Sequence, residues 1–255
     1  FGNNRYIFVI IDKSINYLIW KEYEKETRKL YDEIKKIWPD NNSWYDYTHQ
    51  TIIDFIYSNS ALFFQNGNVL NAGSGGSIYN GISGKFFHVD ISDKFIKELP
   101  NSYVASIENL PFNTNFFDTA ICVGSVINYC DALTALSEIY RVLKHDSYLI
   151  LEYERSSTGE LIFQKDYNKS ITLQVYQYNN QDNHKIWLYS DKYINSILKN
   201  IGFKLVDNRY YHVFSSLYNH FADDENKSGK IAKLDKIAAT FVKKYLAHNR
   251  IMTCY

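Results

Sequence analysis

The chain has 255 residues, and its 28 Lys and Arg balance 28 Asp and Glu, so the formal net charge is +0. That length predicts one domain of ordinary size, and the neutral balance excludes a protein that binds nucleic acid through bulk positive charge. Three cysteines without a CxxC spacing exclude a disulfide framework and a zinc site, so we expect no metal and a reducing, cytoplasmic compartment.

Two helices are predicted before residue 60. In Ser14–Trp38, Lys and Glu side chains recur three or four residues apart, and Pro39 would end the helix. A second helix, Tyr47–Asn59, carries four large apolar side chains that would form one buried stripe. Residues 1–60 are therefore expected to form an N-terminal helical cap.

Short apolar runs then alternate with polar segments. The predicted strands are Asn68–Ala72, Lys85–Asp90, Phe117–Val123 and Ser147–Tyr153. Between the last two, Asp131–Leu143 places apolar residues at helical spacing. Strands alternating with helices predict a mostly parallel sheet that binds its ligand beyond the carboxyl ends of the strands. Residues 61–154 are expected to be a cofactor-binding core.

The pattern changes after this core. Ile171–Tyr178 and His184–Tyr189 predict a hairpin around a loop at Asn179–Asn183, within a β-rich insertion of residues 155–190. Residues 191–255 are expected to complete the sheet, with a helical insertion at 222–248. The elements predicted there are a helix at Asp191–Asn200, a strand at Phe203–Tyr211, a flexible lid at Ala222–Gly229, a helix at Lys230–His248 and a strand at Arg250–Tyr255.

A glycine turn follows the first predicted strand. Gly73 and Gly75 would let backbone approach a ligand closely, and the next helix would present free N–H groups. Asp90 ends the second strand, where an acid accepts hydrogen bonds from ribose hydroxyls. The third glycine of a dinucleotide fingerprint is replaced by Ile78, which counts against a nicotinamide oxidoreductase.

Two more segments complete an ordered set of four motifs. In chain order these are Asn71–Ser77, Asp90, Leu110-Pro-Phe112 with Phe117-Asp118, and Glu138 with Arg141, Leu143 and Lys144. In this order and spacing the sequence resembles the class I S-adenosylmethionine-dependent methyltransferases, and most closely the branch that acts on small molecules. The resemblance covers about Tyr47–Glu154 well and the remainder loosely.

The resemblance implies a Rossmann-like α/β fold. A seven-stranded, mostly parallel sheet would be flanked by helices, with N-terminal helices and a small insertion after the fifth strand. It also implies S-adenosyl-L-methionine as the cofactor and S-adenosyl-L-homocysteine as its product. The positions expected to contact the cofactor are Asn71, Ala72, Gly73, Ser74, Gly75, Asp90, Ile91, Ser106, Ile107, Glu108, Gly124, Ser125 and Asn128.

Methyl transfer needs mainly alignment and a dry pocket, although a hydroxyl acceptor also needs a proton acceptor. The candidate catalytic residues are Tyr129, Glu152 and His49, with His212 and His220 weighed as structural or surface histidines. Tyr45, Tyr47 and Tyr129 are the aromatic side chains expected to contact the substrate.

The expected function is transfer of a methyl group to an oxygen, nitrogen or carbon atom of a small molecule. The alternatives are a methyltransferase acting on RNA or protein, and a catalytically silent module that binds S-adenosylmethionine or S-adenosylhomocysteine. No basic stretch is seen and no apolar run approaches ~20 residues, so we expect no nucleic acid or membrane partner. A monomer and a homodimer both remain open.

Overall fold

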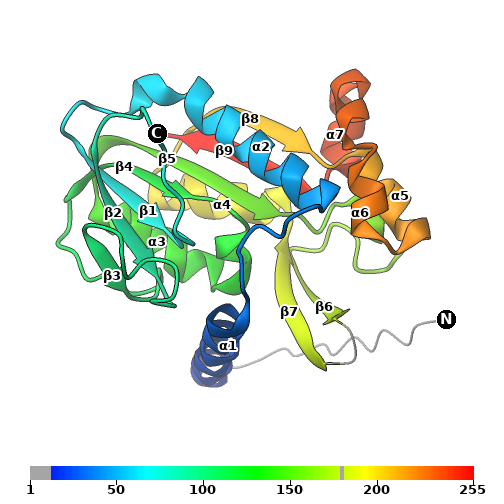
Figure 1. The fold of residues 1–255 in the computed structure, drawn as a ribbon, viewed down its shortest axis with the longest axis horizontal. Helices are drawn as coiled ribbons and strands as arrows, with labels where there is room; N and C mark the ends of the chain where they lie inside the picture. Colours follow the sequence, from blue (N-terminus) through cyan, green and yellow to red (C-terminus); the bar gives the residue numbers. More distant parts are fainter. Residues whose placement is uncertain (1–12, 179–180) are drawn as a thin grey trace.

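The computed structural model describes residues 13–178 and 181–255, and the side chains of residues 22–175 and 185–255. Its main sheet has seven strands in the order β3-β2-β1-β4-β5-β9-β8 (Figure 1). These strands are β1 Asn68–Ala72, β2 Lys85–Asp90, β3 Ser102–Val104, β4 Phe117–Cys122, β5 Leu143–Glu154, β8 Leu205–Tyr211 and β9 Asn249–Cys254. The strands β1 to β5 and β8 run in one direction, and β9, between β5 and β8, runs antiparallel to both of these neighbours. The predicted seven-stranded, mostly parallel fold is confirmed.

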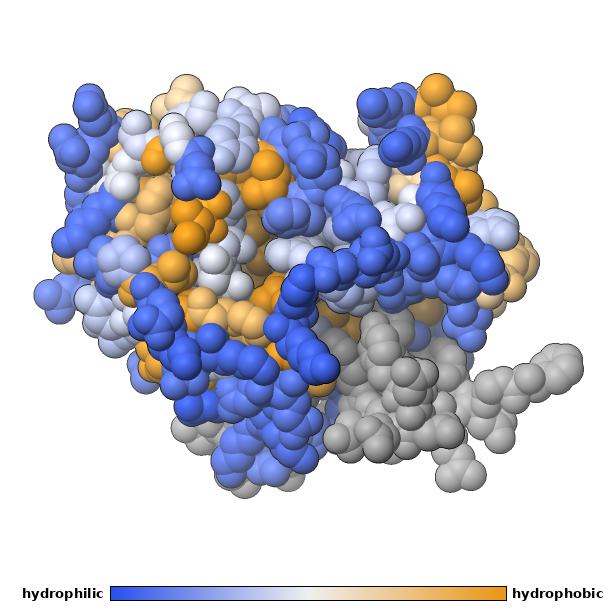
Figure 2. All heavy atoms as spheres, viewed as in Figure 1, coloured by the Kyte–Doolittle hydropathy of each residue, from blue (hydrophilic) through white to orange (hydrophobic). Residues whose placement is uncertain are grey.

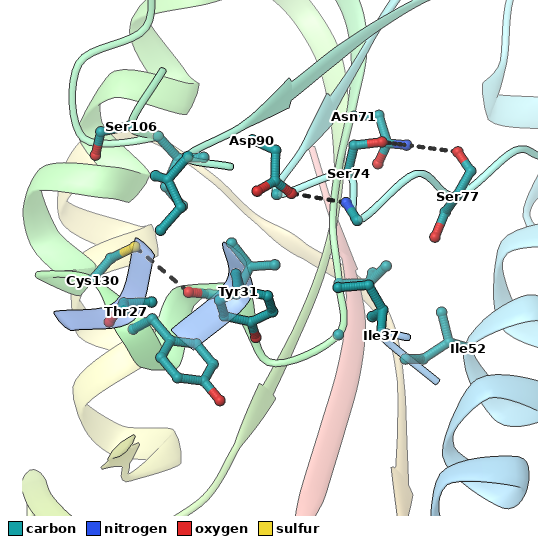
Figure 3. A pocket seen from close by; sticks show the side chains of 18 of the residues that line it. Thr27, Tyr31, Ile37, Ile52, Asn71, Ser74, Ser77, Asp90, Ser106 and Cys130 are labelled. Atoms are coloured by element: carbon teal, nitrogen blue, oxygen red, sulfur yellow. Dashed lines mark hydrogen bonds between the residues drawn. The ribbon is translucent and has the colours of Figure 1, made fainter. Parts of the chain in front are cut away.

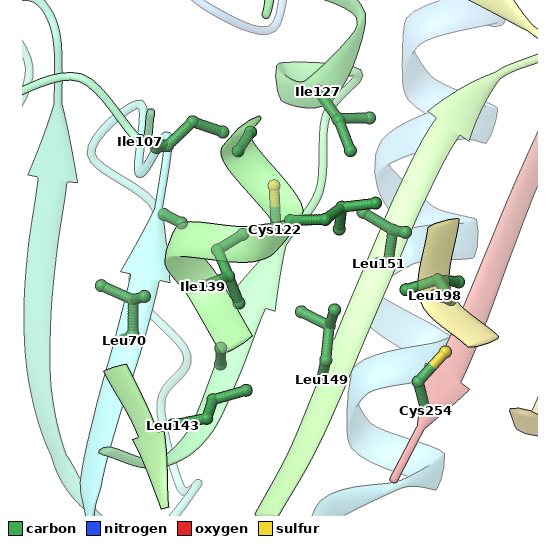
Figure 4. Packing of buried hydrophobic residues seen from close by; sticks show 14 of the residues in the cluster. Leu70, Ile107, Cys122, Ile127, Ile139, Leu143, Leu149, Leu151, Leu198 and Cys254 are labelled. Atoms are coloured by element: carbon green, nitrogen blue, oxygen red, sulfur yellow. The ribbon is translucent and has the colours of Figure 1, made fainter. Parts of the chain in front are cut away.

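Helices cover both faces of this sheet. On one face α2 (Ser43–Ser58) packs Ile52 and Phe55 against alternate residues of the central strands. On the other, α3 (Ala132–Val142) and α4 (Asp191–Ile201) pack against the residues in between. Figure 4 shows Leu70, Leu149 and Ile139 meeting on this second face. Burial on both faces explains why the central strands appear in the sequence as continuous apolar runs.

The first helix is shorter than predicted. α1 spans Lys13–Glu33 and stops five residues before Trp38. A side chain from another segment caps its C-terminal end: Lys94 Nζ donates to the backbone oxygens of Asp32 (2.9 Å) and Ile34 (2.5 Å). The residues that leave the helix, Ile37 and Trp38, turn toward the carboxyl edge of the sheet.

The region after β8 differs most from expectation. β8 ends at Tyr211 because His212 adopts a left-handed backbone (φ 55°), and the chain then enters a helix that was not predicted. The predicted helix Lys230–His248 is wrong, because extended backbone at Ala238 and Ala239 divides it. The helices of this C-terminal cap are α5 Phe214–Ala222, α6 Glu225–Gly229, η4 Ala232–Ile237 and α7 Thr240–Leu246. α6 lies within the segment predicted as a flexible lid.

A separate two-stranded sheet forms most of the predicted insertion. β6 (Ile171–Tyr178) pairs antiparallel with β7 (Gln181–Tyr189). The second strand therefore begins three residues earlier than expected. Of the predicted loop, residues 179–180 lie outside the described part of the chain, and residues 181–183 belong to β7.

Candidate active site

One pocket lies at the carboxyl ends of β1, β2 and β4, under α1 and α2 (Figure 3). Its empty volume is about 930 Å³, including the part open to solvent. This is the size of a site for a cofactor or drug-sized ligand. Of the residues predicted to contact cofactor, those that line it are Asn71, Gly73, Ser74, Gly75, Asp90, Ile91, Ser106, Ile107, Glu108 and Gly124.

The glycine turn forms the floor of the pocket. Gly73 has φ +66°, and a Cβ there would lie 2.3 Å from both Cγ atoms of Val126. Ser74 N donates to the backbone oxygen of Val89 (2.9 Å), which ties the turn to the neighbouring strand. No helix follows within residues 73–84, so the predicted helix N-terminus is wrong. The backbone of the turn itself, rather than a helix dipole, faces the ligand space.

Asp90 presents its carboxylate to the pocket from the end of β2. Oδ2 accepts from Gly75 N (2.8 Å) and Oδ1 accepts from Ser92 N (3.1 Å). Burial raises the pKa of Asp90, and these backbone hydrogen bonds act in the opposite direction. The carboxylate also lines the pocket, so its remaining lone pairs can accept hydrogen bonds from hydroxyl groups of a ligand.

Asn71 fastens the turn from beneath. Its Nδ2 donates to Ser74 Oγ (3.1 Å) and to the backbone oxygen of Ser77 (3.2 Å). Ser74 Oγ also lies 2.9 Å from His88 Nδ1, and burial lowers the pKa of His88, so this network is uncharged at neutral pH. An amide at this position therefore holds the turn without adding charge to the pocket.

The aromatic wall comes from segments far apart in the sequence. Tyr129 lines the pocket, and its ring lies edge-on to Tyr31 of α1 at a centroid distance of 5.6 Å. His49 lines it from α2 and lies 4.8 Å from the ring of Trp38. Burial lowers the pKa of His49, and this effect is larger than the opposite effect of the nearby Asp46. The imidazole is therefore neutral at physiological pH.

Glu152 does not line the pocket, and its predicted contact with substrate is wrong. Its buried carboxylate accepts from the backbone N–H groups of Gly124 (2.9 Å) and Ser125 (2.7 Å) through Oε2. Oε1 accepts from Tyr211 Oη (2.9 Å) and Asn249 Nδ2 (2.8 Å). Glu152 is therefore a positioning residue that fixes the turn after β4, and burial raises its pKa.

Other predicted site residues also lie outside the pocket lining. Ala72 is buried in the core, and Asn128 donates to the backbone oxygens of Glu154 (2.9 Å) and Trp187 (2.6 Å). Ser125 Oγ donates to Glu154 Oε1 (2.8 Å). Tyr45 and Tyr47 lie away from it as well, and Tyr47 packs on the ring of His212 at 5.2 Å. None of these residues lines the pocket, and their contacts with a ligand stay predictions.

The two remaining histidine candidates have structural partners. His212 is stacked on Trp44 at 3.8 Å and lies within hydrogen-bond distance of Thr48 Oγ1 (2.8 Å). His220 Nδ1 lies 2.8 Å from the backbone oxygen of Glu160. Neither lines the pocket, which agrees with their reading as structural or surface residues.

Sequence reasoning missed the lining residues Thr27, Tyr31 and Trp38. They lie in and just after a charged helix, and no local pattern marks them as part of a site. Only the packing of α1 over the sheet brings them to the pocket. A buried ion pair, His248 Nε2 to Glu154 Oε2 at 3.1 Å, was missed for the same reason.

Among the side chains of residues 22–175 and 185–255, no group of three or more His, Cys, Asp or Glu residues is arranged to hold a metal ion.

Comparison with known proteins agrees with this geometry. A family model described as a methyltransferase domain matches residues 70–151. A search of curated proteins gives no significant match. Among solved structures, the chain is similar to 1,6-didemethyltoxoflavin-N1-methyltransferase from Burkholderia thailandensis, solved with 1,6-didemethyltoxoflavin and S-adenosylhomocysteine. The identity is 13%, the TM-score is 0.60, and 98% of this chain and 92% of that chain are covered.

Two further structures share the fold. Geranyl diphosphate C-methyltransferase from Streptomyces coelicolor A3(2) has 10% identity and a TM-score of 0.56, covering 91% of this chain and 97% of that chain. A putative S-adenosylmethionine-dependent methyltransferase from Listeria monocytogenes has 11% identity and a TM-score of 0.57, with 81% and 97% covered. Residues 70–151 therefore form a methyltransferase domain, and the sheet order and the glycine turn beside Asp90 agree with the fold of the class I S-adenosylmethionine-dependent methyltransferases.

Proposed function

We propose that this methyltransferase acts on a small-molecule acceptor bound between α1 and the turn after β4. The observation that carries the proposal is that α1 lies across the pocket and is fastened there. Ser92 Oγ donates to Asp32 Oδ1 (2.6 Å), and Lys94 holds the carbonyls at the end of the helix. A pocket covered in this way favours a compact acceptor over a polymer.

Two further observations support a small acceptor. The structural neighbours from Burkholderia and Streptomyces act on 1,6-didemethyltoxoflavin and geranyl diphosphate, which are both small molecules. The net charge of +0 gives no bulk attraction for RNA. The wall formed by Tyr31, Tyr129 and Trp38 favours an acceptor with an apolar or aromatic body.

The residues of the floor fit the cofactor. Asp90 would accept hydrogen bonds from the ribose hydroxyls, and the backbone of the turn at Gly73–Gly75 would lie along the methionine part. A side chain at Gly73 would collide with Val126 and displace this turn. When bound, S-adenosylmethionine supplies the activated methyl group. The chain's own contribution is to orient the acceptor and exclude water.

Proton handling is assigned to His49 within the same proposal. Its neutral imidazole lines the pocket and can take a proton from a hydroxyl or amine acceptor. Burial raises the pKa of both Tyr31 and Tyr129, so these phenols stay protonated and serve as hydrogen-bond partners rather than bases.

The test is methyl-labelled S-adenosylmethionine incubated with two fractions of a cell extract, one of metabolites and one of RNA and protein. We expect label in the metabolite fraction, and a His49→Gln variant that still binds S-adenosylhomocysteine but transfers at least about 10²-fold more slowly. Label in the polymer fraction alone would establish the macromolecular alternative. Tight binding without transfer to either fraction would indicate a silent module.

A further inference from the structure

The C-terminal cap carries an exposed apolar surface that the active site does not use. Figure 2 shows apolar residues gathered along the edge of the molecule over α5 and α7. We call this surface the cap patch. Its members, with their exposed fractions, are Phe163 (71%), Tyr218 (45%), Phe221 (72%), Leu234 (50%), Ile237 (80%), Phe241 (69%) and Tyr245 (57%). A gathering of this kind on one small region is the usual mark of an interaction surface.

The members of the cap patch come from neighbouring elements. Phe163 follows η3 (Gly159–Leu161), which packs against α5, and its ring lies 6.5 Å from the ring of Phe221 in α5. Phe241 and Tyr245 are four residues apart in α7 and share one face of that helix. Both α7 and η4 pack against α5, so the apolar side chains belong to one structural unit.

Lysines are interleaved with these apolar residues. Residues 230–246 contain five lysines, at 230, 233, 236, 243 and 244, and one acid, Asp235. Asp235 is buried and accepts from the backbone N–H groups of Val213 (3.0 Å) and Phe214 (3.1 Å). None of the five lysines forms an ion pair with a side chain that the structure describes. Residues 230–246, which carry Leu234, Ile237, Phe241 and Tyr245 of the cap patch, are thus cationic, whereas the residues 223–225 that follow Phe221 are acidic.

The charge decides between possible occupants. In a symmetric dimer the same surface meets itself, so the lysines would face lysines across the interface and repel. An anionic bilayer surface complements both features, because lysines pair with lipid headgroups while Phe, Ile and Tyr side chains enter the interfacial layer. Figure 1 shows α7 projecting from the body of the fold, where a flat surface can reach it.

We propose that the cap patch docks this methyltransferase on the surface of an anionic phospholipid membrane. No helix in residues 13–178 and 181–255 is long and apolar enough to cross a bilayer, so the contact is peripheral. The absence of a long apolar run led us to expect no membrane partner, and that argument addresses spanning segments only. The pocket and the cap lie at the same carboxyl edge of the sheet. Helix α6 of the cap packs against α2, and α2 also lines the pocket.

The test is co-sedimentation of the whole chain with two kinds of vesicle, one of pure phosphatidylcholine and one containing phosphatidylserine as well. We expect binding to the mixed vesicles that weakens as salt is raised, and much weaker binding to phosphatidylcholine alone. Replacing Lys233 and Lys236 by Gln should weaken binding about 25-fold, since each lysine contributes about fivefold. The Ile237→Ser/Phe241→Ser double variant should weaken it more than about tenfold.

Matched controls remove the same groups elsewhere. Lys192→Gln/Lys199→Gln changes the net charge equally on α4, and Leu205→Ser/Val206→Ser removes exposed apolar side chains from β8. Both should bind vesicles like the unaltered protein, and all variants should retain affinity for S-adenosylhomocysteine, which verifies folding. Absence of binding to the mixed vesicles at low salt would overturn the proposal. So would a dimer, detected by sedimentation, that the Ile237→Ser/Phe241→Ser variant dissociates.

Discussion

Two polar clusters lie along the carboxyl edge of the sheet and are built in opposite ways. Around the glycine turn the partners are close in sequence, as where Asp90 accepts from Gly75, and the carboxylate still faces an open pocket. Around the end of β5 the partners are distant, as where Glu152 accepts from Asn249, and the carboxylate is fully enclosed. The first cluster keeps hydrogen-bonding capacity for a ligand. The second uses its capacity to hold remote segments together.

This comparison predicts that damage to the β5 cluster affects stability most. Glu152→Ala would leave four buried donors without an acceptor, at about 1–3 kcal/mol each, so we expect a loss of about 5 kcal/mol or more. Glu152→Gln keeps one acceptor oxygen and should lose about half as much. Urea unfolding followed by circular dichroism measures both. Equal stability of the alanine variant and the unaltered chain would remove the distinction between the clusters.

The glycine turn can be disturbed with a matched pair of variants. Gly73→Ala combines a left-handed backbone with a Cβ that collides with Val126, and we expect about 2–5 kcal/mol of destabilisation and loss of S-adenosylhomocysteine binding. Gly81 also has a positive φ (+81°), but no atom lies within 4 Å of its Cβ position. Gly81→Ala should therefore cost only about 1–2 kcal/mol. Identical binding by the two variants would contradict the role of close packing in the turn.

The pH dependence of stability should come from the β5 cluster. Burial lowers the pKa of His248, but Glu160 and Glu154 outweigh it and raise that pKa to about 9. Because the folded pKa lies above the unfolded value of about 6.5, this contribution is complete below pH 6.5 and is lost as pH rises through 9. We expect about 3 kcal/mol to disappear over that window, measured by urea unfolding at several pH values. A His248→Gln variant should show a much smaller slope in the upper part of that window, above the pKa of about 7 of the neighbouring Glu225, and an unchanged slope there would exclude His248 as the cause.

The smallest expected effect belongs to the open cluster and falls on binding rather than folding. Asp90→Ala should weaken S-adenosylhomocysteine binding by about 1–3 kcal/mol, because hydrogen bonds to a charged acceptor are lost. Its stability should change less than that of Glu152→Ala, since the side chain of Asp90 accepts two hydrogen bonds from backbone amides, whereas that of Glu152 accepts four hydrogen bonds. Calorimetric titration checks the affinity. Unchanged affinity in a folded variant would remove Asp90 from the cofactor site.

Local patterns predicted the central part of the fold closely. β1 and β2 have the predicted bounds, and α3 differs from its prediction by one residue at each end. These elements are buried on the sheet, where apolar periodicity and burial agree. The edge strand β3 was missed, because a strand of three residues carries no periodicity that can be recognised. The prediction for the C-terminal cap was wrong, because the turn at His212 depends on contacts between segments that are far apart in the sequence.

The sequence by itself determined β1, β2 and α3, the glycine turn and the acid that faces the pocket, because these depend on residues close together in the chain. Only the tertiary structure decided that Tyr31 and Trp38 wall the pocket, that Glu152 supports the turn after β4 and that His248 pairs with Glu154. Such roles depend on which distant segments meet when apolar surface is buried. The residues next to a side chain in the sequence do not indicate which distant segments it will contact.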